Sequence, residues 1–106
     1  MLVISYGSRE LAHRCTKLEL AQEWLGPADA QALVDLIADA EAMESAAALI
    51  EFYEADISEN DSLSIVFSPR YRALLEPIGH KVPRGDGKKP MWAQVRRLLL
   101  VNVLEP

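Results

Sequence analysis

The chain has 106 residues, half of them apolar and a quarter charged, which is the size and composition of one globular domain, residues 1–106. No apolar run is long enough to cross a bilayer, and no basic segment with a long apolar core opens the chain, so we expect neither membrane nor secretion. The single cysteine excludes an internal disulfide and suits a reducing compartment, so we expect a cytoplasmic protein.

The net charge of −5 conceals a division between the two halves of the chain. Residues 1–61 hold 13 acidic and three basic side chains, whereas residues 62–106 hold three acidic and eight basic ones. A polyanion or an acidic partner bound by the basic half would explain this asymmetry. Two solvated faces that keep the chain soluble would explain it equally well, so both interpretations stay open at this point.

The first quarter of the chain predicts a strand followed by helix. Residues 2–6 are mostly apolar and β-branched, and they end at a Gly-Ser pair, which is typical of a strand. Ser8 is a candidate cap for a helix that begins at Arg9 and extends to Leu25. Thr16 is a candidate break in this helix, because its hydroxyl can cap a second short helix.

A second helical segment follows Gly26, which suits the end of one helix before the proline that begins the next. Apolar residues then recur at helical spacing and predict a helix over residues 27–43. Ser45 can cap one further turn over residues 46–50.

From residue 62 onward, the spacing of apolar residues changes from the helical repeat to every second residue. Residues 62–67 alternate as a half-buried strand, Ser-Pro makes a tight turn, and residues 70–75 form the second arm of a hairpin. Residues 78–90 are rich in Gly, Pro and Lys and predict an exposed excursion, and residues 98–103 predict a central strand buried on both faces. The order of elements predicts an α+β fold, with an N-terminal strand, two to three helices and a mostly antiparallel sheet that carries the helices on one face.

Arg70, Tyr71 and Arg72 form the first candidate site. In a strand the two arginines would share one face, about 6–7 Å apart, and the tyrosine would face the helices. Two planar guanidinium groups at this spacing suit a phosphate. Pairing of both arginines with the acidic helices is the structural alternative.

The excursion is the second candidate site, because it concentrates bases that could hold a nucleic-acid backbone or an acidic peptide. The residues concerned are His80, Lys81, Arg84, Lys88 and Lys89. A solvated loop would have the same composition.

No metal or other cofactor is expected. His13 and Cys15 lie two residues apart on a predicted helix, so they point in different directions, and no further residues have metal-ligand spacing. We therefore interpret Cys15 as a core residue.

Residues 62–77 (SLSIVFSPRYRALLEP) resemble the central hairpin of the RelE/ParE superfamily, and in particular of its HigB-type plasmid maintenance killer branch. Residues 4–11 (ISYGSREL) and the apolar final strand after Trp92 and Val95 are similar to the same branch. The resemblance implies a RelE-like toxin fold.

The resemblance also implies a function. Members of this family are toxins of type II toxin–antitoxin modules, and most cleave mRNA on the ribosome until a cognate antitoxin neutralises them. By this likeness Arg72 would hold the phosphate, with Arg70 and His80 as further catalytic candidates and Tyr71, Lys81, Arg84, Lys88 and Lys89 as substrate contacts. The implied partners are a helix-turn-helix antitoxin, the ribosome with its mRNA, and operator DNA reached only through the antitoxin.

The chain departs from the family pattern at two places. Residues 51–61 contain acids and no base, where relatives have a histidine or a lysine-rich segment, and Pro106 follows Glu105, where relatives often have an aromatic residue and a histidine. A catalytically degenerate protein that binds the antitoxin and helps to regulate transcription is therefore an alternative. A gyrase poison of the ParE type is a third interpretation.

Overall fold

Five strands form one sheet in the order β1-β5-β4-β3-β2 in the computed structural model, which describes residues 2–78 and 90–105. The strands are β1 (Val3–Tyr6), β2 (Asp56–Ile57), β3 (Leu63–Val66), β4 (Arg72–Pro77) and β5 (Arg97–Leu104). β1 runs parallel to β5, and every other neighbouring pair is antiparallel. The α+β class and the mostly antiparallel sheet are thus confirmed.

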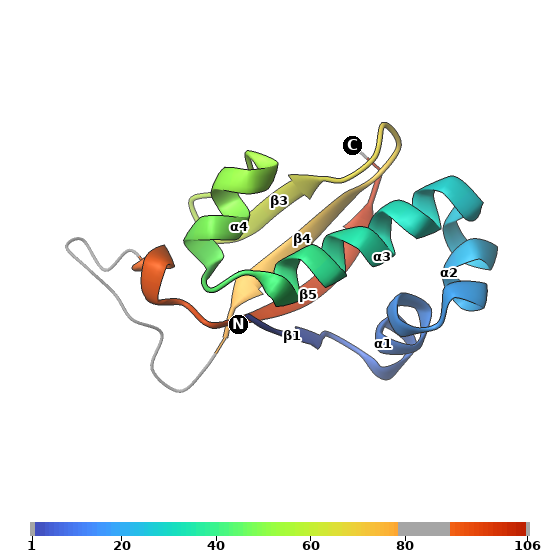
Figure 1. The fold of residues 1–106 in the computed structure, drawn as a ribbon, viewed down its shortest axis with the longest axis horizontal. Helices are drawn as coiled ribbons and strands as arrows, with labels where there is room; N and C mark the ends of the chain where they lie inside the picture. Colours follow the sequence, from blue (N-terminus) through green and yellow to red (C-terminus); the bar gives the residue numbers. More distant parts are fainter. Residues whose placement is uncertain (1, 79–89, 106) are drawn as a thin grey trace.

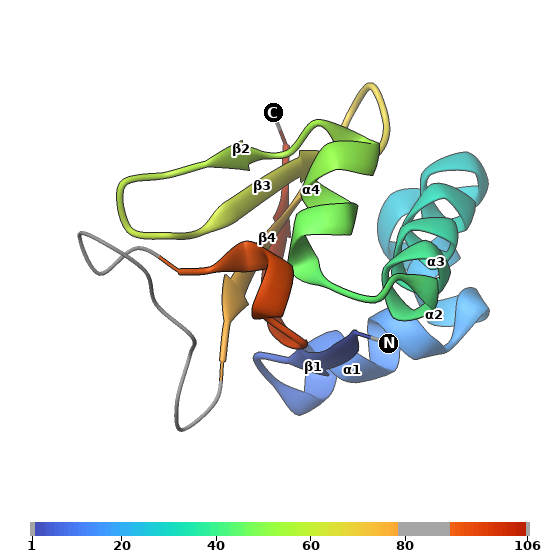
Figure 2. The ribbon, with the colours of Figure 1, turned by 60° about the vertical axis from the view of Figure 1, so that its left-hand side comes forward.

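Four α-helices lie between the first and second strands: α1 (Arg9–Thr16), α2 (Leu18–Leu25), α3 (Pro27–Ala42) and α4 (Ala46–Tyr53). A short 3-10 helix, η2 (Trp92–Gln94), precedes β5. α3 and α4 lie over one face of the sheet (Figure 1), and α1 and α2 pack against α3 at one end of it. The helices therefore form one layer and the sheet forms the other, as a second view shows (Figure 2).

Two serine caps set the starts of α1 and α4, as the sequence predicts. The Oγ of Ser8 accepts a hydrogen bond from the amide of Leu11 (3.1 Å), and the Oγ of Ser45 accepts one from the amide of Ala48 (3.4 Å). Both serines have extended backbone angles, so each lies just outside its helix.

The predicted helix over residues 9–25 is divided at Lys17. The described residues therefore contain four α-helices, whereas two or three were expected. Thr16 does not cap the second helix, because its hydroxyl donates a hydrogen bond of 2.7 Å to the carbonyl of Ala12, within its own helix. A second break separates α2 from α3 at Gly26, whose φ of +88° favours glycine, and Pro27 begins α3.

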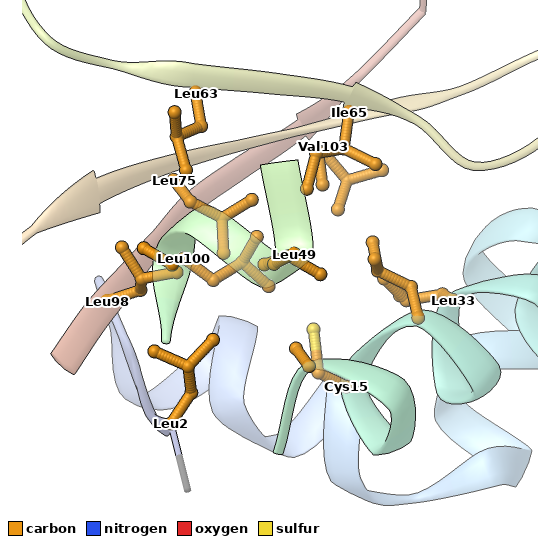
Figure 3. Packing of buried hydrophobic residues seen from close by; sticks show 14 of the residues in the cluster. Leu2, Cys15, Leu33, Leu49, Leu63, Ile65, Leu75, Leu98, Leu100 and Val103 are labelled. Carbon is orange, nitrogen blue, oxygen red and sulfur yellow. The ribbon is translucent and has the colours of Figure 1, made fainter. Parts of the chain in front are cut away.

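The core lies between the helices and one face of the sheet. Leucines from three strands meet Leu33 of α3 and Leu49 of α4 there, and Cys15 of α1 packs into the same cluster (Figure 3). The sheet residues on this side are Leu63, Ile65, Ala73, Leu75, Leu98, Leu100 and Val103. None of the described helices covers the opposite side, which we call the open face; it carries the residues that alternate with this core set in the strands.

The open face corrects the prediction for the final strand. β5 does have strands on both sides, β1 and β4, but it is buried on one face only, and Arg97, Val101 and Asn102 are exposed. A β-bulge in the pairing with β4 adds Val101 to β5, so that Leu100 and Val103 both face the helices. The apolar run over residues 98–101 therefore results from the bulge at Val101 and the half-buried position of Leu99, and not from helices on both faces of the strand.

No helix in residues 2–78 and 90–105 has the combination of length and apolar content that crossing a membrane requires.

The environment of Cys15 generates a test of this packing. The residue is 4% exposed, and burial raises the pKa of its thiol from 9.0 to about 11. The higher pKa alone lowers the thiolate fraction at pH 8 about 100-fold. We therefore expect iodoacetamide to alkylate the native chain at least about 100-fold more slowly than the chain unfolded in urea, as mass spectrometry would measure.

The matched control moves the thiol by one position. The double variant Cys15→Ala, Thr16→Cys places it on an exposed side of α1, where we expect alkylation close to the unfolded rate. A native chain that reacts as fast as this control would show that Cys15 is not in the core.

Candidate functional site

The central strand β4 divides its side chains between the two faces of the sheet. Ala73 and Leu75 are buried against the helices, so Arg72, Leu74 and Glu76 alternate with them onto the open face. The pairing registers extend this assignment to the neighbouring strands. The open face then comprises Val3, Ser5, Asp56, Ser64, Val66, Arg72, Leu74, Glu76, Arg97, Leu99, Asn102 and Leu104.

The open face includes several apolar side chains although none of the described helices covers it (Figure 2). Val3 and Val66 are 52% and 58% exposed, and Leu74, Leu99 and Leu104 are half-buried among their neighbours in the sheet. The pairing registers place polar residues beside these apolar ones, so the face is mixed in character. A mixed face of this kind resembles the composition of protein interfaces.

Arg72 is the cation near one end of this surface. It pairs with Val66 on one side and with Leu104 on the other. Its Nε is buried and has no hydrogen-bond partner among residues 2–78 and 90–105, and no carboxylate of these residues forms an ion pair with its guanidinium. A desolvated donor without an acceptor costs free energy, so the side chain is suited to receive an anion.

Arg70 and Tyr71 do not belong to the strand, which corrects the prediction that Arg70 and Arg72 share a strand face. The Oγ of Ser68 accepts hydrogen bonds from the amides of Arg70 (3.3 Å) and Tyr71 (3.1 Å), and this local turn delays the start of β4 to Arg72. Arg70 is exposed, with its guanidinium 5.9 Å from the centre of the Tyr71 ring. Tyr71 packs against the core, as predicted.

The other predicted site residues lie outside the described part of the chain. His80, Lys81, Arg84, Lys88 and Lys89 all belong to residues 79–89. Their roles in catalysis and substrate binding remain predictions.

The sequence did not predict that Glu76, Asp56 and Arg97 would lie on the same face of the sheet as Arg72. Glu76 lies on β4 two positions beyond Leu74 and accepts a hydrogen bond of 3.3 Å from the Oγ of Ser62. Asp56 lies on the short edge strand β2, and Arg97 pairs with Val3 at the start of β5. The period of two in β4 contained the signal for Glu76, whereas Arg97 and Asp56 required the pairing registers.

A second concavity of about 750 Å³ lies between α1 and α2. Arg14 already has partners there, because it pairs with Glu10 (2.7 Å) and stacks 5.1 Å from the centre of the Trp24 ring. Arg9 and Glu23 also line this concavity. This cleft therefore lacks the unsatisfied donor that distinguishes Arg72.

Tyr53 connects two helices through its hydroxyl. The hydroxyl of Tyr53 on α4 donates a hydrogen bond of 2.6 Å to Asp39 on α3, and burial together with this bond raises the pKa of Tyr53. Within residues 2–78 and 90–105, no three His, Cys, Asp or Glu side chains are grouped so as to hold a metal ion.

The orphaned Nε of Arg72 predicts that this side chain lowers stability. We expect Arg72→Met to raise the free energy of unfolding by about 1 kcal/mol, because it removes a buried donor without a partner and keeps most of the apolar contact. Urea denaturation would measure the change.

Arg14→Met is the matched control. It removes an arginine that has both an ion pair and an aromatic contact, so we expect it to lower the free energy of unfolding by about 0.5–1 kcal/mol. A loss of stability in Arg72→Met equal to that of the control would show that the Arg72 guanidinium has partners in the folded chain.

No family model matches the chain, and comparisons with curated proteins and with solved structures find no match either.

Proposed function

We propose that the chain is the toxin of a type II toxin–antitoxin module, of the RelE/ParE superfamily and its HigB-type branch, and that it cleaves mRNA on the ribosome. The observation that carries the proposal is Arg72, a cation on the open face whose Nε is buried and has no acceptor in the described part of the chain. The hairpin between β3 and β4 and the single layer of helices are consistent with the fold that the sequence resemblance implies.

The proposed chemistry needs a cation beside the phosphate that reacts. The 2′-hydroxyl of the substrate gives its proton to a base and attacks the adjacent phosphorus, while the bond from phosphorus to the 5′-oxygen of the next nucleotide breaks and that oxygen takes up a proton. Negative charge accumulates on the phosphate oxygens in the transition state. The Arg72 guanidinium would donate hydrogen bonds to those oxygens, as preorganised donors do in other enzymes of this kind. Val66 and Leu104 flank Arg72 in the sheet and limit its hydration, which strengthens the interaction.

Arg70 and the loop residues would complete the site. Arg70 is exposed in the turn directly before β4, close enough along the chain to contact the same RNA strand. His80 is the candidate for proton transfer, and Tyr71, Lys81, Arg84, Lys88 and Lys89 are candidates for RNA contacts. No cofactor or metal enters this scheme.

The proposal also names partners and a location. A cognate helix-turn-helix antitoxin would neutralise the toxin in the cytoplasm, and operator DNA would be reached only through that antitoxin. The ribosome and its mRNA would be the target.

Induced expression tests the activity. We expect wild-type chain to arrest growth and to cut translated messages, and Arg72→Ala to lower the cleavage rate about 100-fold or more, as primer extension on a reporter mRNA would measure. Arg14→Ala removes an arginine of helix α1, which is not part of the open face, so this variant should cleave like the wild type. Normal growth with intact messages under strong induction would refute the nuclease proposal.

The open face also favours a second candidate, a toxin-fold protein that binds its antitoxin and has lost nuclease activity. Asp56 and Glu76 lie on the same face as Arg72, and carboxylates there repel RNA phosphates. The apolar side chains between them suit a protein partner better than a nucleic-acid backbone.

Copurification distinguishes the two candidates. A degenerate toxin should bind the product of an adjacent antitoxin gene and increase its affinity for operator DNA, while expression of the chain alone leaves messages intact. Gel-shift titration with and without the chain would measure the effect. Failure to bind that product would remove this candidate.

A further inference from the structure

The open-face side chains of β4 follow a cation–apolar–anion order. Arg72 comes first, Leu74 lies in the middle, and Glu76 comes last, each two residues from the next. Positions two apart on one face of a strand are about 6–7 Å apart, so the two charges stand at similar distances on either side of Leu74.

This order is self-complementary. A second copy can be placed over the open face so that the two β4 strands are antiparallel. The two-fold axis then lies between the sheets and crosses the strands at Leu74, and Arg72 of each copy lies over Glu76 of the other. Leu74 then meets its own symmetry mate. Such isologous contacts are the usual basis of homodimers, because one pairing satisfies both copies.

We propose that two copies of this chain associate through their open faces in this antiparallel register, with Arg72 of each copy bound to Glu76 of the other.

Two features of the isolated chain support a second copy as the occupant. The guanidinium of Arg72 forms no ion pair with a carboxylate of the described residues, and a carboxylate arriving from above the sheet would supply one. Glu76 is exposed, and its one hydrogen bond, from Ser62, is long at 3.3 Å, so its carboxylate is available.

The apolar residues of the open face lie where the two sheets would pack. Val66, Leu74, Leu99 and Leu104 are exposed or half-buried on the monomer. Sheets that stack face to face lie about 10 Å apart with strand directions within about 30° of each other, which leaves long Arg and Glu side chains within reach of one another.

The size of the face sets the expected strength. A six-residue strand in a five-stranded sheet gives a patch of about 20 by 20 Å, on the order of 400–500 Å² per copy. This area is below that of most stable dimers, and the net charge of −5 on each copy opposes association. We therefore expect a reversible dimer that forms at micromolar or higher concentrations.

Charge reversal tests the register. Sedimentation equilibrium from about 10 to about 500 µM should show wild-type chain moving from its monomer mass of 11.8 kDa toward twice that mass. Arg72→Glu and Glu76→Arg should each weaken dimerisation more than about 10-fold, because each places like charges opposite one another. The double variant Arg72→Glu, Glu76→Arg should restore it, because the pairs re-form in reverse.

Arg9→Glu is the matched control, since it makes the same change of charge on α1 and should dimerise like the wild type. Circular dichroism of each variant verifies that it is folded. A wild-type chain that stays monomeric throughout the range overturns the proposal, whether or not it binds an acidic peptide of another protein. A folded double variant that stays monomeric, or single variants that dimerise normally, also overturns it.

The inference concerns the same arginine as the proposed function but does not depend on it. The mass measurement involves no RNA, so loss of the dimer and loss of nuclease activity are separate results. If both proposals hold, dimer formation and RNA phosphate compete for Arg72, and the dimer is an inactive store of the protein.

Discussion

One-sided burial of the sheet is the constraint on which the rest of the structure depends. All four α-helices come from a single stretch between β1 and β2, and they form one layer on the face that carries Ala73 and Leu75. The alternation of β4 then places Arg72, Leu74 and Glu76 on the face that none of the described helices covers (Figure 2). Both proposals made for this chain concern side chains of that face.

Most of the fold could be predicted from the sequence, whereas less of the candidate site could be. Serine caps, the Gly-Pro break and the change of period were local signals, and they located the helices and the β3–β4 hairpin because local chemistry determines them. The break beside Thr16 was predicted but its cause was wrong, and the late start of β4 was missed, because each depends on how a side-chain hydroxyl is used. Thr16 binds its own helix and Ser68 closes a turn, and neither outcome is encoded in periodicity.

The open face shows why site prediction was harder. Arg72 was identified from its neighbours in sequence, whereas Arg97 and Asp56 join it only through strand pairing across the sheet. The final strand was expected to be covered on both faces because its composition is apolar throughout. Composition alone could not reveal that exposed Val101 and half-buried Leu99 would remain outside the helix layer.

The bulge in β5 has a consequence for how this strand can change during evolution. Val101 is the extra residue that lets Leu98, Leu100 and Val103 reach the same side of the sheet despite their uneven spacing. A point substitution on the outer side would leave that phase intact. Gain of one residue after the bulge would instead invert everything downstream, moving Asn102 inward and Val103 outward, whereas loss of Val101 would give a regular strand with both residues on their present sides. This strand should therefore tolerate changes of side chain far better than insertions.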